Sequence, residues 1–203
     1  MKLRYSPTSP YVRKVAVAAL ETGLDGRIER IETDVWNPET DIAEDNPLGK
    51  VPALVTDEGM VLCDSPTICD YLDSLHDGPR LVPAEGPGRW QVLNLHALAN
   101  GIMDAAVARV VEVRARPEDK RFDGWLQRQT LKIGRALDAL ESRAAAGGLD
   151  GPVTLGTITL GCALGYLDLR FSEDAWRDGR PALAAWYEAF SQRPSMQATV
   201  PPG

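Results

Sequence analysis

Ser9 and Pro10 stand in the turn between a predicted strand and a predicted helix, within the segment SPYVRKV. Ser9 is suited to cap this helix and Pro10 to occupy its first position, where a missing N–H costs nothing. Unpaired backbone N–H groups and the positive end of the helix dipole therefore converge beside a hydroxyl. Such a place stabilises an anion, although a plain helix start with Ser9 as the cap explains the same residues.

A second feature is a proline at the head of a predicted strand, in the segment NPLGKVPALV that begins at Asn46. Pro52 cannot donate to a sheet ladder. A cis Val51–Pro52 bond would turn the backbone N–H and C=O of Val51 outward, where they could pair with an extended, peptide-like ligand. An ordinary trans proline at a strand start is the alternative, and the residues alone do not decide between the isomers.

A third feature is an acidic residue followed by a hydroxyl, Asp64 and Ser65, at the start of a predicted helix. Both residues lie in the segment DSPTICDYL. Ser65 is expected as its N-cap and Pro66 as its first helical residue. The helix N-terminus would hold a ligand's carboxylate and Asp64 its ammonium, both through charge-assisted hydrogen bonds. The pair suits the head group of an α-amino acid, and a plain helix start is again the alternative.

The changing hydrophobic period of the first half predicts the elements that carry these residues. Apolar residues alternate in strand-like segments and recur every three or four residues in helical ones. A tight turn at residues 57–59 makes the last two strands an antiparallel hairpin. The predicted elements are strand 2–5, helix 10–22, strand 27–32, strand 51–56, strand 61–63 and helix 65–75. Their order is βαβ followed by ββα, with a polar stretch at 34–49 between the two groups.

The second half has a helical period throughout. Residues 78–88 are rich in Gly and Pro and are expected to form a linker, so the predicted domains are 1–77 and an all-helical 89–203. Two long helices, expected to pack antiparallel, carry apolar stripes from Val92 to Val113 and from Leu126 to Leu140. Two further helices are predicted at about 155–169 and 181–192.

The charge balance is acidic, with 22 Lys and Arg residues against 29 Asp and Glu and a net charge of −7 over 203 residues. This balance, without long basic runs, argues against nucleic acid as a partner. The sequence shows neither a basic-plus-apolar leader nor a long apolar run. We therefore expect no export and no membrane span, and a cytoplasmic protein.

The cysteines and histidines do not suggest a disulfide framework or a metal site. Cys63, Cys69 and Cys162 are odd in number and lack CxxC spacing, so reduced thiols are expected. His76 and His96 have no cysteine at ligand spacing. We expect packing or solvent-facing roles for both histidines and no bound metal.

Taken together and in this order, the segments SPYVRKV, NPLGKVPALV and DSPTICDYL resemble the glutathione-transferase superfamily over essentially the whole chain. The sequence is most similar to the bacterial serine-type, YibF-like group, and the segment ALANGIMDA in the first long helix adds to this similarity. The resemblance implies an α+β thioredoxin-like N-terminal domain of order βαβββα, followed by an all-α C-terminal domain. It also implies a cis Pro52 and a glutathione site at the domain boundary.

The resemblance further assigns a role to the first hydroxyl. Ser9 matches the serine that hydrogen-bonds the glutathione sulfur and favours its thiolate. Ser6 and Thr8 are neighbouring hydroxyls that could take its place.

The remaining site residues are implied in the same way. Val51, with Pro52, matches the residue whose backbone pairs with the cysteinyl part of glutathione. Lys50 is expected near the glycine carboxylate. Asp64 with Ser65 matches the acidic-plus-serine pair that holds the γ-glutamyl end.

The activity implied by the resemblance is that of a transferase, in which the glutathione thiolate attacks an apolar electrophile without any metal. A glutathione-binding or interaction module without turnover remains open, as does a glutathione-dependent peroxidase or disulfide reductase. A glutaredoxin-like oxidoreductase is a weaker hypothesis. Its nucleophilic cysteine would stand where Ser9 is, and Val12 occupies the position of a resolving cysteine.

Two structural expectations complete the comparison with the family. Relatives dimerise about a two-fold axis, so we expect a homodimer in which Trp90, Met103 and Tyr71 supply apolar area.

In the capping box of the helical domain, Thr157 stands where relatives carry Asp. Its hydroxyl can still accept the backbone N–H of the cap residue, Thr154.

Overall fold

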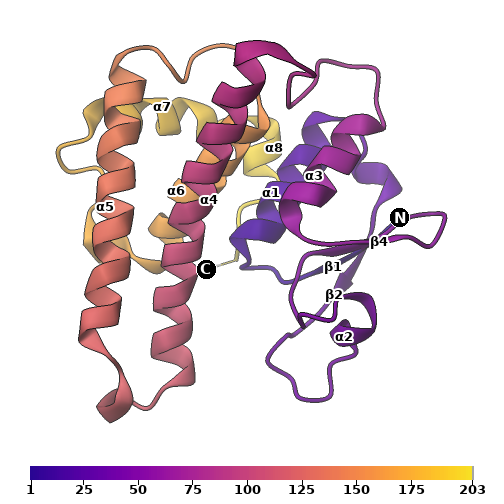
Figure 1. Ribbon diagram of the computed structural model, residues 1–203, viewed down its shortest axis with the longest axis horizontal. Helices are drawn as coiled ribbons and strands as arrows, with labels where there is room; N and C mark the ends of the chain where they lie inside the picture. Colours follow the sequence, from indigo (N-terminus) through magenta and orange to yellow (C-terminus); the bar gives the residue numbers. More distant parts are fainter. Residues whose placement is uncertain (203) are drawn as a thin grey trace. The chain divides into compact units, whose positions relative to one another are not determined.

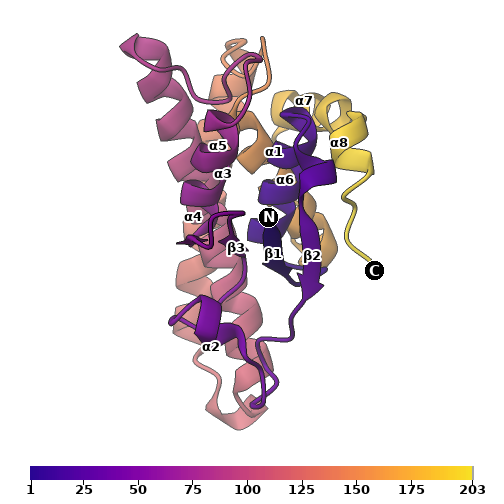
Figure 2. The same ribbon diagram turned by 90° about the vertical axis from the view of Figure 1, so that its right-hand side faces the viewer.

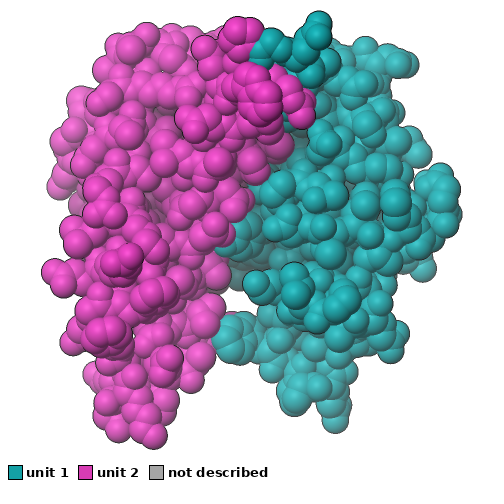
Figure 3. All heavy atoms as spheres, viewed as in Figure 1, with its two compact units in different colours: residues 1–86, 194–203 teal, residues 87–193 magenta. Residues whose placement is uncertain are grey.

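The computed structural model describes residues 1–202 and divides the chain into two compact units. One unit comprises residues 1–86 together with the end of the chain from residue 194, and the other comprises residues 87–193 (Figure 3). The end of the chain thus packs with the first unit, whereas the domains predicted from sequence place it in the helical second half.

The first unit contains a four-stranded mixed sheet of order β2-β1-β3-β4 (Figures 1 and 2). The central strand β1 (Lys2–Tyr5) pairs in parallel with β2 (Glu29–Glu32) and antiparallel with β3 (Ala53–Val55). Strand β3 pairs antiparallel with β4 (Val61–Leu62), as the predicted hairpin requires. The predicted βαβ and ββα groups are therefore confirmed. Strand β1 has the predicted bounds, and the other three strands are shorter than predicted.

Two helices supply most of the buried apolar surface beside the sheet. Helix α1 (Pro10–Glu21) contacts helix α3 (Ser65–Ser74), and α3 also contacts β3. Val15 on α1 and Ile68 on α3 are fully buried, as expected for positions that recur at helical spacing.

A short helix that the sequence did not predict, α2 (Ile42–Asp45), interrupts the polar stretch before β3. Ile42 is its one buried apolar side chain. The nearly buried guanidinium of Arg4 on β1 pairs with Asp41 and with Asp45, the latter at 2.9 Å between Nε and Oδ2. Helix α2 is therefore held to the central strand by charge.

The end of the chain forms a second unpredicted short helix, α8 (Pro194–Gln197), which contacts α1. The buried Arg13 side chain donates to the Met196 carbonyl at 3.1 Å. The Ser195 hydroxyl donates to the Glu21 carboxylate at 2.5 Å. These contacts explain why residues from 194 onward belong to the first unit.

The second unit is helical, as predicted, and its two longest helices run antiparallel (Figure 1). Helix α6 is buried along nearly its whole length, so it forms the centre of this unit. Its Thr159 hydroxyl lies 2.9 Å from the ring of His96 on the first long helix. The helices of this unit are α4 (Gly86–Ala115), α5 (Asp123–Ala145), α6 (Leu155–Arg170) and α7 (Pro181–Ser191).

The start of α6 carries the expected capping box. The Thr154 hydroxyl accepts the Thr157 backbone N–H at 3.2 Å, and the Thr157 hydroxyl accepts the Thr154 backbone N–H at 2.9 Å. An uncharged threonine thus completes the reciprocal pair.

None of the helices in residues 1–202 is both long and apolar enough to cross a membrane. Within the same residues, no three His, Cys, Asp or Glu side chains gather in a way that could hold a metal ion.

Candidate functional site

Ser9 is the N-cap of α1, as predicted, with extended backbone angles of φ −75° and ψ 123°. The Val12 backbone N–H donates to its Oγ at 3.4 Å, and Pro10 takes the first helical position. Because Oγ acts as acceptor in this contact, its own hydrogen is left for another partner. Ser6 and Thr8 are also half-buried, and their hydroxyls make no hydrogen bond within residues 1–202.

The Val51–Pro52 peptide bond is cis, as predicted. The strand begins two residues later than expected, at Ala53, so Val51 and Pro52 lie outside the sheet ladder. Val51 is partly exposed, and its backbone N–H and C=O take part in no hydrogen bond with any residue that the structure describes. Both groups are therefore available to an extended ligand. The neighbouring Lys50 is exposed.

The N-cap of α3 is Asp64, and the expectation that Ser65 caps this helix is wrong. Asp64 has extended angles of φ −103° and ψ −158°, and its carbonyl accepts the first helical hydrogen bond, from Ile68 at 3.0 Å. Ser65 and Pro66 are thus the first two helical residues. Proline is tolerated at the second position because the N–H there would also lack an intrahelical partner.

The two predicted head-group ligands on α3 have free polar atoms. The Asp64 side chain makes no capping bond and is exposed. Ser65 is 1% exposed as a whole residue, and its hydroxyl makes no hydrogen bond within residues 1–202. The hydroxyl can therefore donate to a ligand.

The register of the sheet brings the three segments to one edge. Arg4, near the end of β1, pairs with Ala53 at the start of β3, and Leu54 pairs with Leu62 at the end of β4. The loop after β1, the segment before β3 and the segment after β4 therefore meet at the same end of the strands. These segments carry Ser9, then Lys50 to Pro52, and then Asp64 with Ser65.

One feature of this edge had no sequence signal. The peptide bond between Cys63 and Asp64 is also cis, although no proline follows Cys63. Cys63 is exposed and Cys69 and Cys162 are buried, and none of the three forms a disulfide within residues 1–202.

Comparison with known proteins agrees with this architecture. The family model for the glutathione S-transferase N-terminal domain matches residues 8–75, and the family model for the C-terminal domain matches residues 123–189. An uncharacterized GST-like protein, YibF from Escherichia coli, is 40% identical over 100% of this chain and 99% of its own length. The chain therefore belongs to the glutathione S-transferase family.

Solved structures of bacterial relatives show the same fold. A glutathione transferase family member from Pseudomonas fluorescens, crystallised with bound glutathione, has a TM-score of 0.95 and 47% identity, covering 100% of this chain and 99% of its own. A glutathione S-transferase from Methylobacillus flagellatus, also with glutathione bound, has a TM-score of 0.92 and 37% identity, covering 99% of both chains.

Proposed function

We propose that this protein is a transferase that binds glutathione and activates its thiol for attack on an apolar electrophile. The observation that carries the proposal is the edge of the sheet, where unpaired backbone groups of Val51 lie between two helix N-termini with free polar side chains. The relative from Pseudomonas fluorescens that binds glutathione supports the choice of ligand.

The tripeptide is proposed to lie along this edge in an extended form. Its γ-glutamyl ammonium faces Asp64, and its α-carboxylate takes the Ser65 hydroxyl and the N-terminus of α3. The cysteinyl N–H and C=O pair with Val51 beside Pro52 as one more strand would. The Lys50 ammonium lies near the glycine carboxylate.

Ser9 is proposed to activate the sulfur. Its hydroxyl hydrogen, which the contact with Val12 leaves unused, donates to the thiolate, and the positive end of the α1 dipole favours the same charge. Stabilising the thiolate lowers the thiol pKa from about 8.5, so that the anion is populated at neutral pH. The proton leaves to solvent, and the sulfur lone pair forms a new bond to the electrophile, which expels a leaving group or takes up a proton.

A second structure of the Pseudomonas fluorescens family member contains S-(propanoic acid)-glutathione, in which the sulfur bears a carbon substituent. This ligand supports a conjugating reaction over a non-catalytic binding module. A peroxidase or disulfide reductase would instead use the bound thiolate on an oxygen or sulfur atom.

A conjugation assay with a general electrophile tests the function directly. The parent should form a glutathione thioether, and Ser9→Ala should lose most of this activity while still binding glutathione. Binding without turnover by the parent would favour the interaction module. Turnover of peroxides or mixed disulfides in place of electrophiles would favour the redox alternative.

The assembly and location are also proposed. We infer a cytoplasmic homodimer, in which Trp90, 67% exposed at the start of α4, and the partly exposed Tyr71 supply apolar area. The expectation for Met103 is wrong, because its side chain is fully buried within its own chain. Equilibrium sedimentation at micromolar concentration should give the dimer mass, and a monomer would contradict the proposal.

A further inference from the structure

Asn46 makes four hydrogen bonds within the loop that leads to Val51, although it was expected only as the start of a motif. Its backbone N–H donates to the Ile42 carbonyl at 2.7 Å, and its carbonyl accepts the Gly49 N–H at 2.8 Å. Its side-chain Oδ1 accepts the Leu48 N–H at 3.1 Å, and Nδ2 donates to the Lys50 carbonyl at 2.7 Å. Asn46 thus connects the helix α2 to the loop as far as Lys50.

Asn46 is itself fixed in position by the residues around it. Asn46 is 2% exposed and follows directly on α2 as its C-cap. Helix α2 is fixed by buried Ile42 and by the ion pairs of Arg4 with Asp41 and Asp45. The position of the Asn46 amide is therefore tied to the central strand β1.

The contact with Lys50 determines the direction of a neighbouring group. The Lys50 carbonyl and the Val51 N–H belong to one planar trans peptide unit, in which they point in opposite directions. Because Nδ2 of Asn46 holds the carbonyl on the buried side, the Val51 N–H points away from Asn46. That N–H has no partner within residues 1–202.

We propose that Asn46 is a positioning residue for the binding of glutathione. Asn46 holds the Lys50–Val51 peptide plane so that the Val51 N–H meets the cysteinyl carbonyl of the ligand. This inference rests on the proposed function. Asparagine is suited to the task because it offers a donor and an acceptor at once. Aspartate would keep the bond to Leu48 but would set a carboxylate oxygen against the Lys50 carbonyl.

The test compares glutathione with an analogue whose cysteinyl carbonyl is a thiocarbonyl, a weaker hydrogen-bond acceptor. The parent should bind the analogue about fivefold more weakly, as expected for a neutral hydrogen bond of about 1 kcal/mol. In Asn46→Ala the Val51 N–H is no longer aimed at the ligand. Glutathione should therefore bind more weakly, and the two ligands should differ by less than about twofold.

Two further variants keep the inference falsifiable. Asn46→Asp, which retains the acceptor for Leu48, should show the same loss of discrimination if Asn46→Ala does not fold. Asn37→Ala removes a matching contact in an exposed loop, where Asn37 Oδ1 accepts the Glu39 N–H at 3.0 Å, and should behave as the parent.

The outcomes separate the two proposals. If a folded Asn46 variant binds glutathione and discriminates between the ligands as the parent does, the positioning role is wrong and the proposed function stands. If the parent binds neither ligand, the proposed function is wrong and the inference with it.

Discussion

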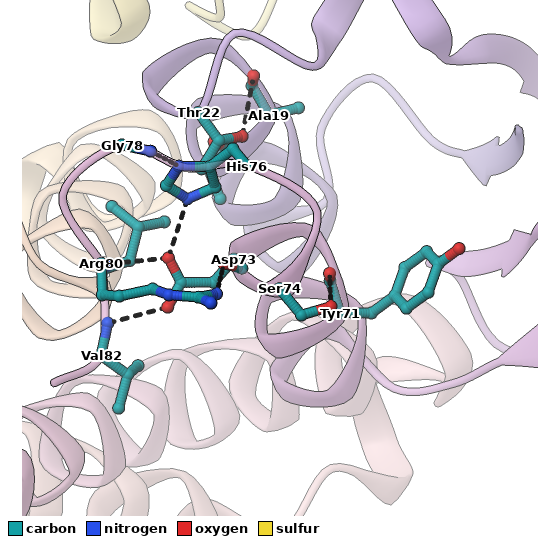
Figure 4. Close-up of polar contacts among 11 residues, drawn as sticks. Ala19, Thr22, Tyr71, Asp73, Ser74, His76, Gly78, Arg80 and Val82 are labelled. Carbon is teal, nitrogen blue, oxygen red and sulfur yellow. Dashed lines mark hydrogen bonds and ion pairs between the residues drawn. The ribbon is translucent and has the colours of Figure 1, made fainter. Parts of the chain in front are cut away.

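The backbone N–H of Leu81 donates to the carboxylate of Asp73 at 2.7 Å and so joins the last turn of α3 to the segment that follows it. The Val82 N–H donates to the other oxygen at 3.1 Å, and the His76 ring lies 3.1 Å from the first (Figure 4). The Arg80 side chain donates to the Asp73 main-chain carbonyl. A single buried acidic residue therefore determines the course of the chain after α3.

Asp73→Asn should lower the free energy of unfolding by about 1–3 kcal/mol, because an amide nitrogen would face a buried N–H and leave it without an acceptor. Urea denaturation of the two proteins measures the difference. Asp77→Asn is the matched control, since Asp77 is exposed and makes no contact of this kind in the described structure. Equal losses in both variants would contradict the role given to Asp73.

Periodic elements were predictable, and short ones were not. The two long helices and the hairpin follow from the spacing of apolar residues. Helices α2 and α8 each have four residues, too few for a period to be visible. They form because tertiary contacts hold them, such as the pairing of Arg4 with Asp45 and the bond from Arg13 to the Met196 carbonyl.

The candidate site was predictable to the level of segments. Ser9 caps its helix as expected, and Pro52 follows a cis bond as expected. The N-cap of α3 lies one residue earlier than predicted, at Asp64 and not at Ser65. Asp and Ser are about equally good caps, so the residue types did not distinguish the two positions. The Asn46 contact with the Lys50 carbonyl could not be predicted from the sequence, because it depends on how a non-periodic loop folds back on itself.

Gly156 on α6 should be sensitive to a single added methyl group. A Cβ there would lie 2.9 Å from the Val92 carbonyl oxygen and 3.0 Å from Leu95 side-chain atoms on α4. Gly156→Ala should therefore destabilise the protein by about 1–3 kcal/mol in chemical denaturation, because backbone cannot easily withdraw.

Gly134→Ala on α5 is its control, since nothing lies within 4 Å of the added atom. This variant should be more stable than the parent by up to about 1 kcal/mol, as alanine favours a helix over glycine. A Gly156→Ala protein as stable as Gly134→Ala would show that α4 and α6 are not in close contact.

Asp64→Ala should weaken glutathione binding more than Ser9→Ala does. The proposed bond to the ligand's ammonium is charge-assisted and contributes roughly 1.5–3 kcal/mol, which is about tenfold to 150-fold in affinity. Titration calorimetry at neutral pH measures this loss. Asp70→Ala removes an exposed carboxylate from the same helix and should bind as the parent does. If Asp64→Ala also binds as tightly as the parent, the head-group site lies elsewhere.

Ser9→Ala should raise the pKa of the bound glutathione thiol, because a hydrogen bond to the thiolate favours the charged form and its loss disfavours it. A rise of roughly 1–2 units would shift the pH profile of the conjugation rate upward. The rate should fall about tenfold or more near neutral pH and approach that of the parent at alkaline pH. The absorbance of the bound thiolate across pH measures the same shift independently of turnover.

Three further variants, compared with Ser9→Ala, distinguish activation from helix capping. Ser9→Ala also removes the acceptor for the Val12 N–H, which costs about 1 kcal/mol of stability. Ser9→Thr keeps both the cap and the hydroxyl and should retain a profile close to that of the parent. Ser6→Ala and Thr8→Ala should leave the profile unchanged. If one of these two shifts the thiol pKa and Ser9→Ala does not, that neighbouring hydroxyl is the activating group; if none does, the backbone N–H groups at the start of α1 are left as the source of activation.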